Sequence, residues 1–140
     1  GRDALVAAVT ATFALPGVPM VYYGQETGLR ETRADMNWVS GDRALSRRVK
    51  SLIDLRESAP ALAGGSVEAV DCDVSVGDDE RVTAFARDDG EQRLVVVLHF
   101  GEGTAEVELS GPVGETDLVT GEPVAEGTTI SVANAVVLAA

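Results

Sequence analysis

The sequence contains very little cysteine, histidine and lysine, and the first two shortages exclude particular kinds of site. A single cysteine, Cys72, excludes an internal disulfide framework and a cysteine-rich metal centre. A single histidine, His99, excludes a histidine ligand cluster, and its apolar neighbours predict a residue of a strand. The acidic residues at 71–73 and 78–80 lack the spacing of a known calcium loop and are interpreted as solvated turns. We therefore expect neither a metal site nor a cofactor.

Positive charge and long apolar runs are also scarce, which limits the classes of partner. The 140 residues carry a formal net charge of −12, and Lys50 is the only lysine. Residues 1–60 hold seven acidic and eight basic residues, whereas residues 61–140 hold sixteen acidic residues and three arginines. Such acidity disfavours nucleic acid and anionic membranes as partners, and no apolar run approaches the roughly 20 residues of a membrane span. Excess carboxylate with scarce lysine is typical of a halophile's protein, whose self-repulsion is screened by salt; a GC-rich genome is the alternative source of this composition.

The first part of the chain predicts a helix followed by a buried strand. Residues 3–15 are rich in alanine, leucine and valine and predict a largely buried helix, which ends at a Pro-Gly pair. Residues 18–23 form a short, continuously apolar run. A strand that is apolar on both faces is typical of the inner wall of a parallel barrel.

A loop and a second helix are expected next. Residues 24–40 show little periodicity and predict a long loop, and loops of this length are usually functional. Asp42 is the expected N-cap of a helix that ends at Pro60. The order of helix, strand, loop and helix is typical of β/α units, but 140 residues are fewer than the roughly 250 of a complete (β/α)₈ barrel. We therefore expect this region to be a piece of such a barrel.

The rest of the chain predicts an antiparallel β-sandwich. Short apolar or alternating runs are separated by turn residues at the spacing of a sandwich. Asp89 and Gly90 predict a hairpin, with these two residues at the centre of its turn. The strands are expected at residues 66–70, 82–87, 93–100, 105–109, 115–118, 129–132 and 135–138.

One motif carries a specific resemblance to a known family. Residues 16–26 read PGVPMVYYGQE, which resembles the motif around the eighth barrel strand of the α-amylase family of glycoside hydrolases. The pattern has a physical rationale, because proline is tolerated at the start of a strand and Gly24 lets the backbone turn into a loop that faces the cleft.

Further matches follow in the family's order. Residues 33–38 are similar to a cleft loop of some subfamilies, residues 52–64 to the last barrel helix and its exit, and residues 117–122 to a turn of the C-terminal β-domain. The resemblance implies an α+β fragment, in which an αβα remnant of the last part of a (β/α)₈ barrel precedes an antiparallel β-sandwich. It places the barrel end at residues 1–60 and the β-domain at residues 61–140.

The resemblance also implies the chemistry. It predicts a C-terminal fragment of a retaining glycoside hydrolase of the α-amylase or α-glucosidase type that acts on α-glucans or oligosaccharides, with Gln25, Glu26, Arg33 and Trp38 as substrate-binding residues. Whether the parent hydrolyses its substrate or transfers glucosyl units instead stays open. Such hydrolysis uses two carboxyl groups roughly 5 Å apart. In this family the catalytic carboxylates come from barrel strands four, five and seven, so no catalytic residue is expected here and the chain alone is expected to be inactive.

Two other functions stay open. One alternative is a non-catalytic carbohydrate-binding β-module with a helical neck. The other is a degenerate protein that is retained as a subunit or regulator. A binding module needs aromatic rings that stack on sugars, and residues 61–140 contain only Phe85 and Phe100 as aromatics. If residues 18–23 lack neighbouring strands, we also expect self-association through this edge.

Overall fold

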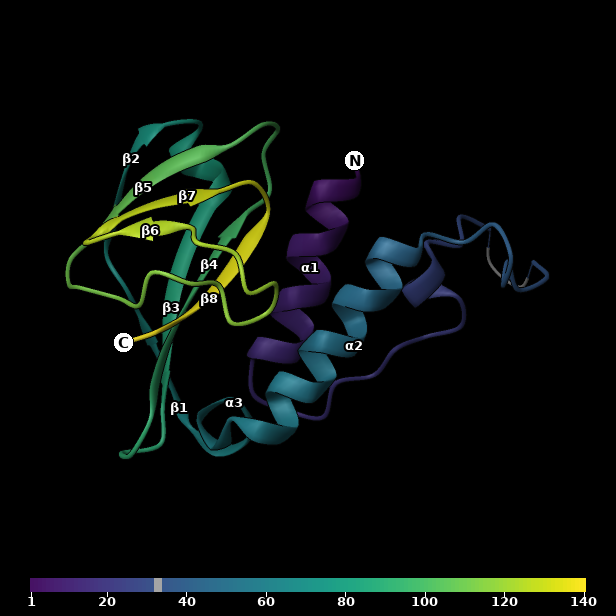
Figure 1. Cartoon of the computed structure of the whole chain (residues 1–140), viewed down its shortest axis with the longest axis horizontal. Coiled ribbons are helices and arrows are strands. Elements are labelled where there is room, and N and C mark those ends of the chain that lie inside the picture. Colours follow the sequence, from purple (N-terminus) through teal and green to yellow (C-terminus); the bar gives the residue numbers. More distant parts are fainter. Residues whose placement is uncertain (32–33) are drawn as a thin grey trace.

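The computed structural model describes residues 1–31 and 34–140, which fold into stacked layers (Figure 1). The helices are α1 (Arg2–Ala14), η1 (Gln25–Thr27), α2 (Arg43–Ser58), α3 (Pro60–Gly64) and η2 (Asp79–Arg81), where η marks a 3-10 helix. The strands are β1 (Ser66–Ala69), β2 (Cys72–Val76), β3 (Val82–Asp88), β4 (Arg93–His99), β5 (Ala105–Leu109), β6 (Ala125–Glu126), β7 (Thr129–Val132) and β8 (Ala135–Ala139). Helix α2 packs on α1, and α1 packs on β4 and β8.

The strands form two four-stranded antiparallel sheets, which confirms an α+β fold with an antiparallel β part. Sheet 1 has the order β1-β3-β4-β8, and sheet 2 has the order β2-β5-β7-β6. Six of the seven strands predicted for the β part are present, with ends that differ by at most one residue from the prediction. They were predictable because alternating and apolar runs bounded by turn residues are a local signal.

Strands β4 and β8 of sheet 1 are buried on both faces, whereas β1 at the opposite edge is exposed. On β4, Leu94 and Val96 belong to the apolar core beneath the helices, whereas Val95 and Val97 belong to the core between the two sheets. Strand β8 alternates in the same way. Because successive side chains of a strand point to opposite faces, this continuous apolar run serves two cores at once.

Helix α2 begins as predicted. The Asp42 carboxylate accepts a hydrogen bond from the Leu45 backbone N–H at 2.9 Å, so it satisfies one of the unpaired donors at the helix start. Leu45, Val49 and Leu52 are buried at helical spacing. The helix ends at Ser58, before Pro60 begins the short helix α3.

The predicted strand at residues 18–23 is wrong. In the structure this segment has no strand assignment, and its side chains are largely exposed, Val18 to 96%. A strand needs a neighbour for its backbone N–H and C=O groups, and no described residue pairs with this segment as a strand. The barrel remnant of the predicted fold is therefore not confirmed.

The predicted strand at residues 115–118 is also absent. Only an isolated bridge between Thr116 and Pro123 lies here. Instead the buried Asp117 carboxylate accepts the N–H groups of Val137 at 2.9 Å and Val119 at 3.2 Å, while Thr120 Oγ1 donates to it at 2.7 Å. The Asp117 side chain thus pairs with one N–H of β8, and the backbone N–H groups of Leu118 and Gly114 donate to the carbonyls of Val137 at 2.8 Å and Ala139 at 2.7 Å, so this segment covers that edge of sheet 1.

Two strands were missed and one turn was misplaced. Strand β2 includes Asp73, which we had interpreted as part of a solvated turn, and β6 has only two residues. The hairpin between β3 and β4 is present, but the Asp89 N–H donates to the Gln92 carbonyl, so Gly90 and Glu91 are the central residues. Gly90 has φ 93°, which favours glycine.

Among the described residues, no helix has the length and apolar character needed to cross a membrane.

Candidate functional site

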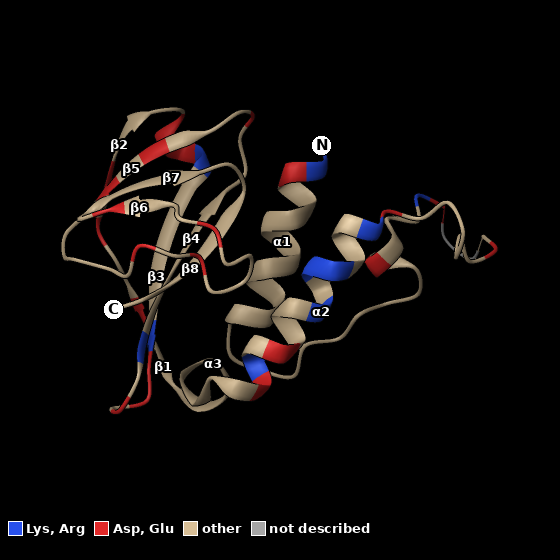
Figure 2. Cartoon of the chain, viewed as in Figure 1, with Lys and Arg blue, Asp and Glu red and all other residues tan. Residues whose placement is uncertain are grey.

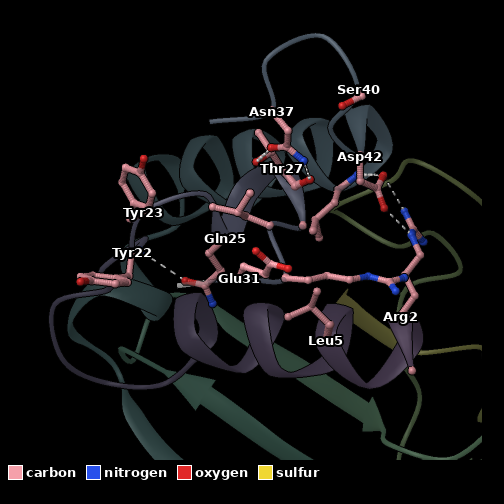
Figure 3. A pocket seen from close by; sticks show the side chains of 15 residues that line it. Arg2, Leu5, Tyr22, Tyr23, Gln25, Thr27, Glu31, Asn37, Ser40 and Asp42 are labelled. Atoms are coloured by element: carbon pink, nitrogen blue, oxygen red, sulfur yellow. Dashed lines mark hydrogen bonds and ion pairs between the residues drawn. The ribbon is translucent and has the colours of Figure 1, made fainter. Parts of the chain in front are cut away.

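An open hollow of about 1010 Å³ lies between α1, η1 and the residues that lead into α2. Figure 3 shows Tyr22 and Tyr23 at one end of this hollow, and Arg2 with Asp42 at the other. Gln25 lies between them. This is the part of the chain for which the sequence predicted a cleft loop, so we take this hollow as the candidate site.

The start of α2 holds η1 in place. The Ser46 hydroxyl donates to the Glu26 carbonyl at 2.6 Å, and the Asp42 N–H donates to the Thr27 carbonyl at 2.9 Å. Gly24 precedes η1 with φ 75°, a conformation that glycine adopts without strain. The site therefore lies on a loop that is fixed by a regular helix.

The path into the site is fixed by Arg56 of α2. Its guanidinium donates to the carbonyls of Phe13 at 2.5 Å and Leu15 at 3.1 Å, and to that of Gly17 at 2.6 Å. These carbonyls lie at and beyond the end of α1, where a helix leaves acceptors unpaired and carries partial negative charge. The segment that reaches Tyr22 is thus anchored where it leaves α1.

An ion pair forms the far end of the hollow. Arg2 Nε lies 2.6 Å from one carboxylate oxygen of Asp42, and its Nη2 lies 3.2 Å from the other. The hydrogen bond from Arg2, followed by that from the Leu45 N–H, lowers the pKa of Asp42 to about 2. Asp42 is therefore ionised at neutral pH and cannot serve as a proton donor there.

The two tyrosines give the near end its character. Tyr22 is 60% exposed, and Tyr23 is 49% exposed with its hydroxyl donating to the Ala34 carbonyl at 2.8 Å. The Tyr22 N–H donates to Gln25 Oε1 at 3.3 Å, which leaves the Gln25 amide nitrogen without a hydrogen bond in the described part of the chain. Aromatic faces and free amide donors suit a ligand rich in hydroxyl groups.

The predicted site residues fare differently. Gln25 lines the hollow, whereas Glu26 does not, because η1 places its half-buried side chain elsewhere. Trp38 is 71% exposed and is not part of the lining. Arg33 lies outside the described residues. The assignment of these four residues to substrate binding stays a prediction.

Two groups of residues were missed. Tyr22 and Tyr23 belong to the motif at residues 16–26 but are not among the predicted site residues, although two adjacent aromatics before a glycine turn are a usable signal. The pairing of Arg2 with Asp42 had no sequence signal, because 40 positions separate the two residues.

Charge divides between the layers. Figure 2 shows the blue basic residues concentrated on α2 and the red acidic residues along the β part and its hairpins.

No three His, Cys, Asp or Glu side chains in the described part of the chain are grouped to hold a metal ion.

We compared the chain with known proteins. No protein-family model matches it. Its sequence is 41% identical over 123 residues to α-amylase MalA of Haloarcula japonica, a match that covers 87% of this chain and 19% of MalA.

Solved structures share the fold. An α-amylase of Geobacillus thermoleovorans, solved with acarbose, aligns with a TM-score of 0.77 at 17% identity over 99% of this chain and 33% of that chain. The maltogenic α-amylase AmyB of Thermotoga neapolitana aligns with a TM-score of 0.76 at 17% identity over 99% of this chain and 36% of that chain. This chain thus spans less than a fifth of MalA and roughly a third of each structure. By sequence and by fold, the chain is therefore similar to the C-terminal part of α-amylase family enzymes, as its motifs predicted.

Proposed function

We propose that this chain is the C-terminal part of a retaining glycoside hydrolase that acts on α-glucans or their oligosaccharides. In this proposal residues 1–60 complete the catalytic barrel, and residues 61–140 form a β-domain that supports it. The similarity to MalA supports the family, and the shared fold with amylase structures supports the arrangement.

The observation that carries the proposal is the exposed apolar segment beside the hollow. Val18 and Met20 are largely exposed, and Tyr22 follows at the edge of the site. A contiguous apolar surface of this kind marks an interface. Neighbouring barrel strands would cover it and would supply the missing backbone partners.

Two carboxylates, Asp42 and Glu31, line the hollow, and in this proposal the hollow serves binding rather than catalysis. Retaining hydrolysis needs one carboxyl group that is protonated and one that is ionised. Asp42 is held ionised by Arg2, which removes it as the acid. Because the resemblance places the catalytic carboxylates on barrel strands four, five and seven, we assign catalysis to other parts of the enzyme, and we assign Tyr22 and Gln25 to contact with the sugar.

A sugar-binding role for the β-domain itself finds less support. Phe85 is 8% exposed and belongs to the core under the helices, and Phe100 packs against the same core. No exposed aromatic ring therefore lies among residues 61–140, all of which the structure describes, so these residues offer no stacking platform.

The test is a graft. The segment of MalA that matches this chain is replaced by this chain, and starch hydrolysis is measured. We expect the chimera to be active, and Tyr22→Ala to lower kcat/KM about tenfold, which corresponds to roughly 1.4 kcal/mol of transition-state binding. Tyr22→Phe is the matched control, because it keeps the ring.

Two results would contradict the proposal. One is a folded chimera without activity, and the other is full activity of the Tyr22→Ala variant. The isolated chain is expected to show no turnover, so a measurable rate from it would place catalytic groups within these residues.

A further inference from the structure

The outer side of α2 carries a stripe of five charged residues. In chain order they are Arg43, Arg47, Lys50, Asp54 and Glu57, and all five are exposed. Successive members are four, three, four and three positions apart, which places them along one side of the helix at the spacing by which two helices contact each other. The buried residues of α2 lie on its other side. We call these five residues the charged stripe.

The charged stripe has no partner within the described part of the chain. None of its five residues takes part in an ion pair among the described residues. Its order also opposes the helix, because the cations lie in the N-terminal half of α2 and the anions in the C-terminal half, whereas the helix dipole favours the reverse (Figure 2). Neighbouring cations of the stripe repel one another as well. These charges therefore do not stabilise α2 by itself.

The order of the charges is complementary to itself in the antiparallel direction. The midpoint between Arg43 and Glu57 is residue 50, and the midpoint between Arg47 and Asp54 lies between residues 50 and 51. At a rise of about 1.5 Å per residue, these two midpoints are less than about 1 Å apart along the helix. One two-fold axis through this point therefore places Arg43 opposite Glu57 and Arg47 opposite Asp54 of a second copy, each contact formed twice.

The position of α2 suits such a contact. Helix α2 is the outer layer, beyond α1 as seen from the β part (Figure 1). Residues 1–60 are nearly balanced in charge, whereas residues 61–140 hold sixteen acidic residues and three arginines. A two-fold contact through α2 places the two acidic β parts on opposite sides of the pair. Repulsion between two chains of net charge −12 is thereby kept small.

We propose that a second copy of this chain docks on the charged stripe, with the two α2 helices antiparallel across a two-fold axis. Exposed ion pairs are individually weak and are screened by salt, so the dimer is weak and sensitive to salt. Lys50 lies at the axis, where it faces its own copy and opposes the pairing. None of the five residues lines the candidate site, so the proposed function does not depend on this dimer.

The first experiment is sedimentation equilibrium of the 140-residue chain at concentrations up to about 1 mM and an ionic strength of about 0.1 M. Charges are screened beyond about 10 Å under these conditions, which weakens the repulsion between the β parts more than the close contacts of the stripe. We expect a monomer–dimer equilibrium with a dissociation constant on the order of hundreds of micromolar, and dissociation in 1 M sodium chloride. A chain that stays monomeric at about 1 mM overturns the proposal.

Charge reversal tests the alignment of the two helices. Arg47→Glu and Asp54→Arg each place like charges opposite one another in two contacts, so each variant alone is expected to dimerise at least about tenfold more weakly. When the two variants are mixed in equal amounts, opposite charges face each other again, and we expect the dimer to return. Both positions are exposed, and circular dichroism checks that the variants fold. A mixture that associates no better than the single variants overturns the proposal.

Lys50→Gln gives a result of the opposite sign. It removes the charge that faces its own copy, so it is expected to strengthen the dimer even though the net charge becomes more negative. Arg81→Gln, at an exposed position of η2 in the β part, is the matched control with the same net charge, and it is expected to leave the dimer unchanged. Equal effects of these two variants overturn the proposal. So does a dimer that persists in both charge-reversed variants, which would place the contact elsewhere, as on the exposed segment at residues 18–23.

Discussion

At the scale of single residues, Arg87 illustrates how a charge is buried without a carboxylate partner. Its side chain is fully buried and donates to the carbonyls of Ala14 at 2.5 Å, Leu62 at 2.9 Å, Gly65 at 2.7 Å and Ser66 at 3.2 Å. Burial lowers the pKa of Arg87. The first three carbonyls lie at the C-terminal ends of α1 and α3, whose partial negative charge offsets the cost of burying the cation.

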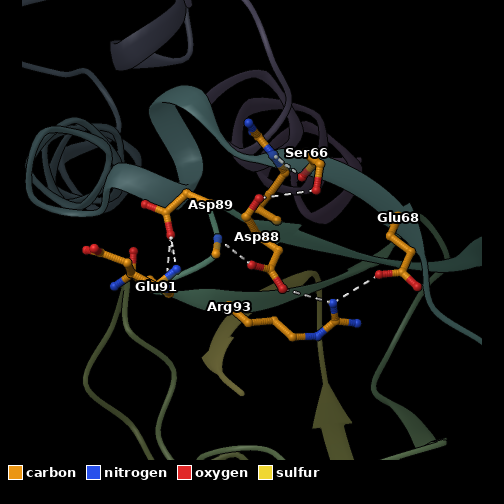
Figure 4. Close-up of polar contacts among 9 residues, drawn as sticks. Ser66, Glu68, Asp88, Asp89, Glu91 and Arg93 are labelled. Carbon is orange, nitrogen blue, oxygen red and sulfur yellow. Dashed lines mark hydrogen bonds and ion pairs between the residues drawn. The ribbon is translucent and has the colours of Figure 1, made fainter.

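Replacing Arg87 is therefore expected to be costly. Arg87→Met leaves buried carbonyls without donors, and we expect the free energy of unfolding to fall by about 3 kcal/mol in urea denaturation. Arg93→Met is the control on the neighbouring strand. Arg93 lies partly exposed between Asp88 and Glu68, at 3.5 and 3.0 Å (Figure 4), so its loss is expected to cost less than about 1 kcal/mol. An equal decrease in the free energy of unfolding for the two variants would show that Arg87 does not stabilise the contacts between α1, α3 and β3.

At the scale of elements, Asp42 joins the starts of two helices. It caps α2 and pairs with Arg2, the first residue of α1. Its pKa of about 2 lies below the usual 3.8, so the stability that it contributes is present above about pH 4 and is lost as the pH falls towards 2.

Asp42→Asn isolates the charge, because asparagine also caps helices well. We expect this variant to melt at a lower temperature than the wild type at neutral pH, and the difference to vanish as the pH falls to about 2. The measurement is thermal melting by circular dichroism across that range. Asp54→Asn, on the same helix but with no hydrogen bond in the described part of the chain, is expected to change little at neutral pH. A difference for Asp42→Asn that persists at low pH would contradict the assigned pKa.

The elements also show how far the sequence could lead. The start of α2 and the strands from β3 to β5 carry local signals, a capping residue and runs of apolar side chains, and they were predicted well. Residues 18–23 carry the same kind of signal, but a strand also needs a neighbour to pair with. Residues 115–118 failed for another reason, because the Asp117 side chain replaced a backbone carbonyl, which no periodicity reveals.

The candidate site was only partly predictable for a related reason. Gln25 follows an aromatic pair in a recognisable motif, so its place in the hollow could be expected. The opposite wall is built by Arg2 and Asp42, which the packing of α1 on α2 brings together. That packing depends on helix surfaces far apart in the chain, and their contact is not encoded in any local pattern.

At the scale of the whole molecule, the uneven charge predicts a dependence on salt. Residues 61–140 hold sixteen of the twenty-three carboxylates, and they repel one another at low ionic strength. We expect the melting temperature to rise steadily as sodium chloride is added, because salt screens this repulsion. The matched variant replaces three exposed carboxylates, Glu102, Glu115 and Glu122, by glutamine, and it is expected to melt higher at low salt and to respond less to salt. A flat or falling salt response of the wild type would contradict the halophile interpretation.

The burial of sheet 1 between two apolar cores has a consequence for recombination between homologous proteins. Phe85 and Val96 belong to the same apolar core as Val9 and Phe13 of α1, so the helical layer and the sandwich share a fitted boundary. A close-packed boundary tolerates volume changes poorly. If the sandwich alone were exchanged between distant homologues, its side chains would no longer fit those of the helices. If it were exchanged together with α1, both sides of this interface would be kept. We expect recombination that preserves folding in such proteins to cut the chain before α1 rather than after α3.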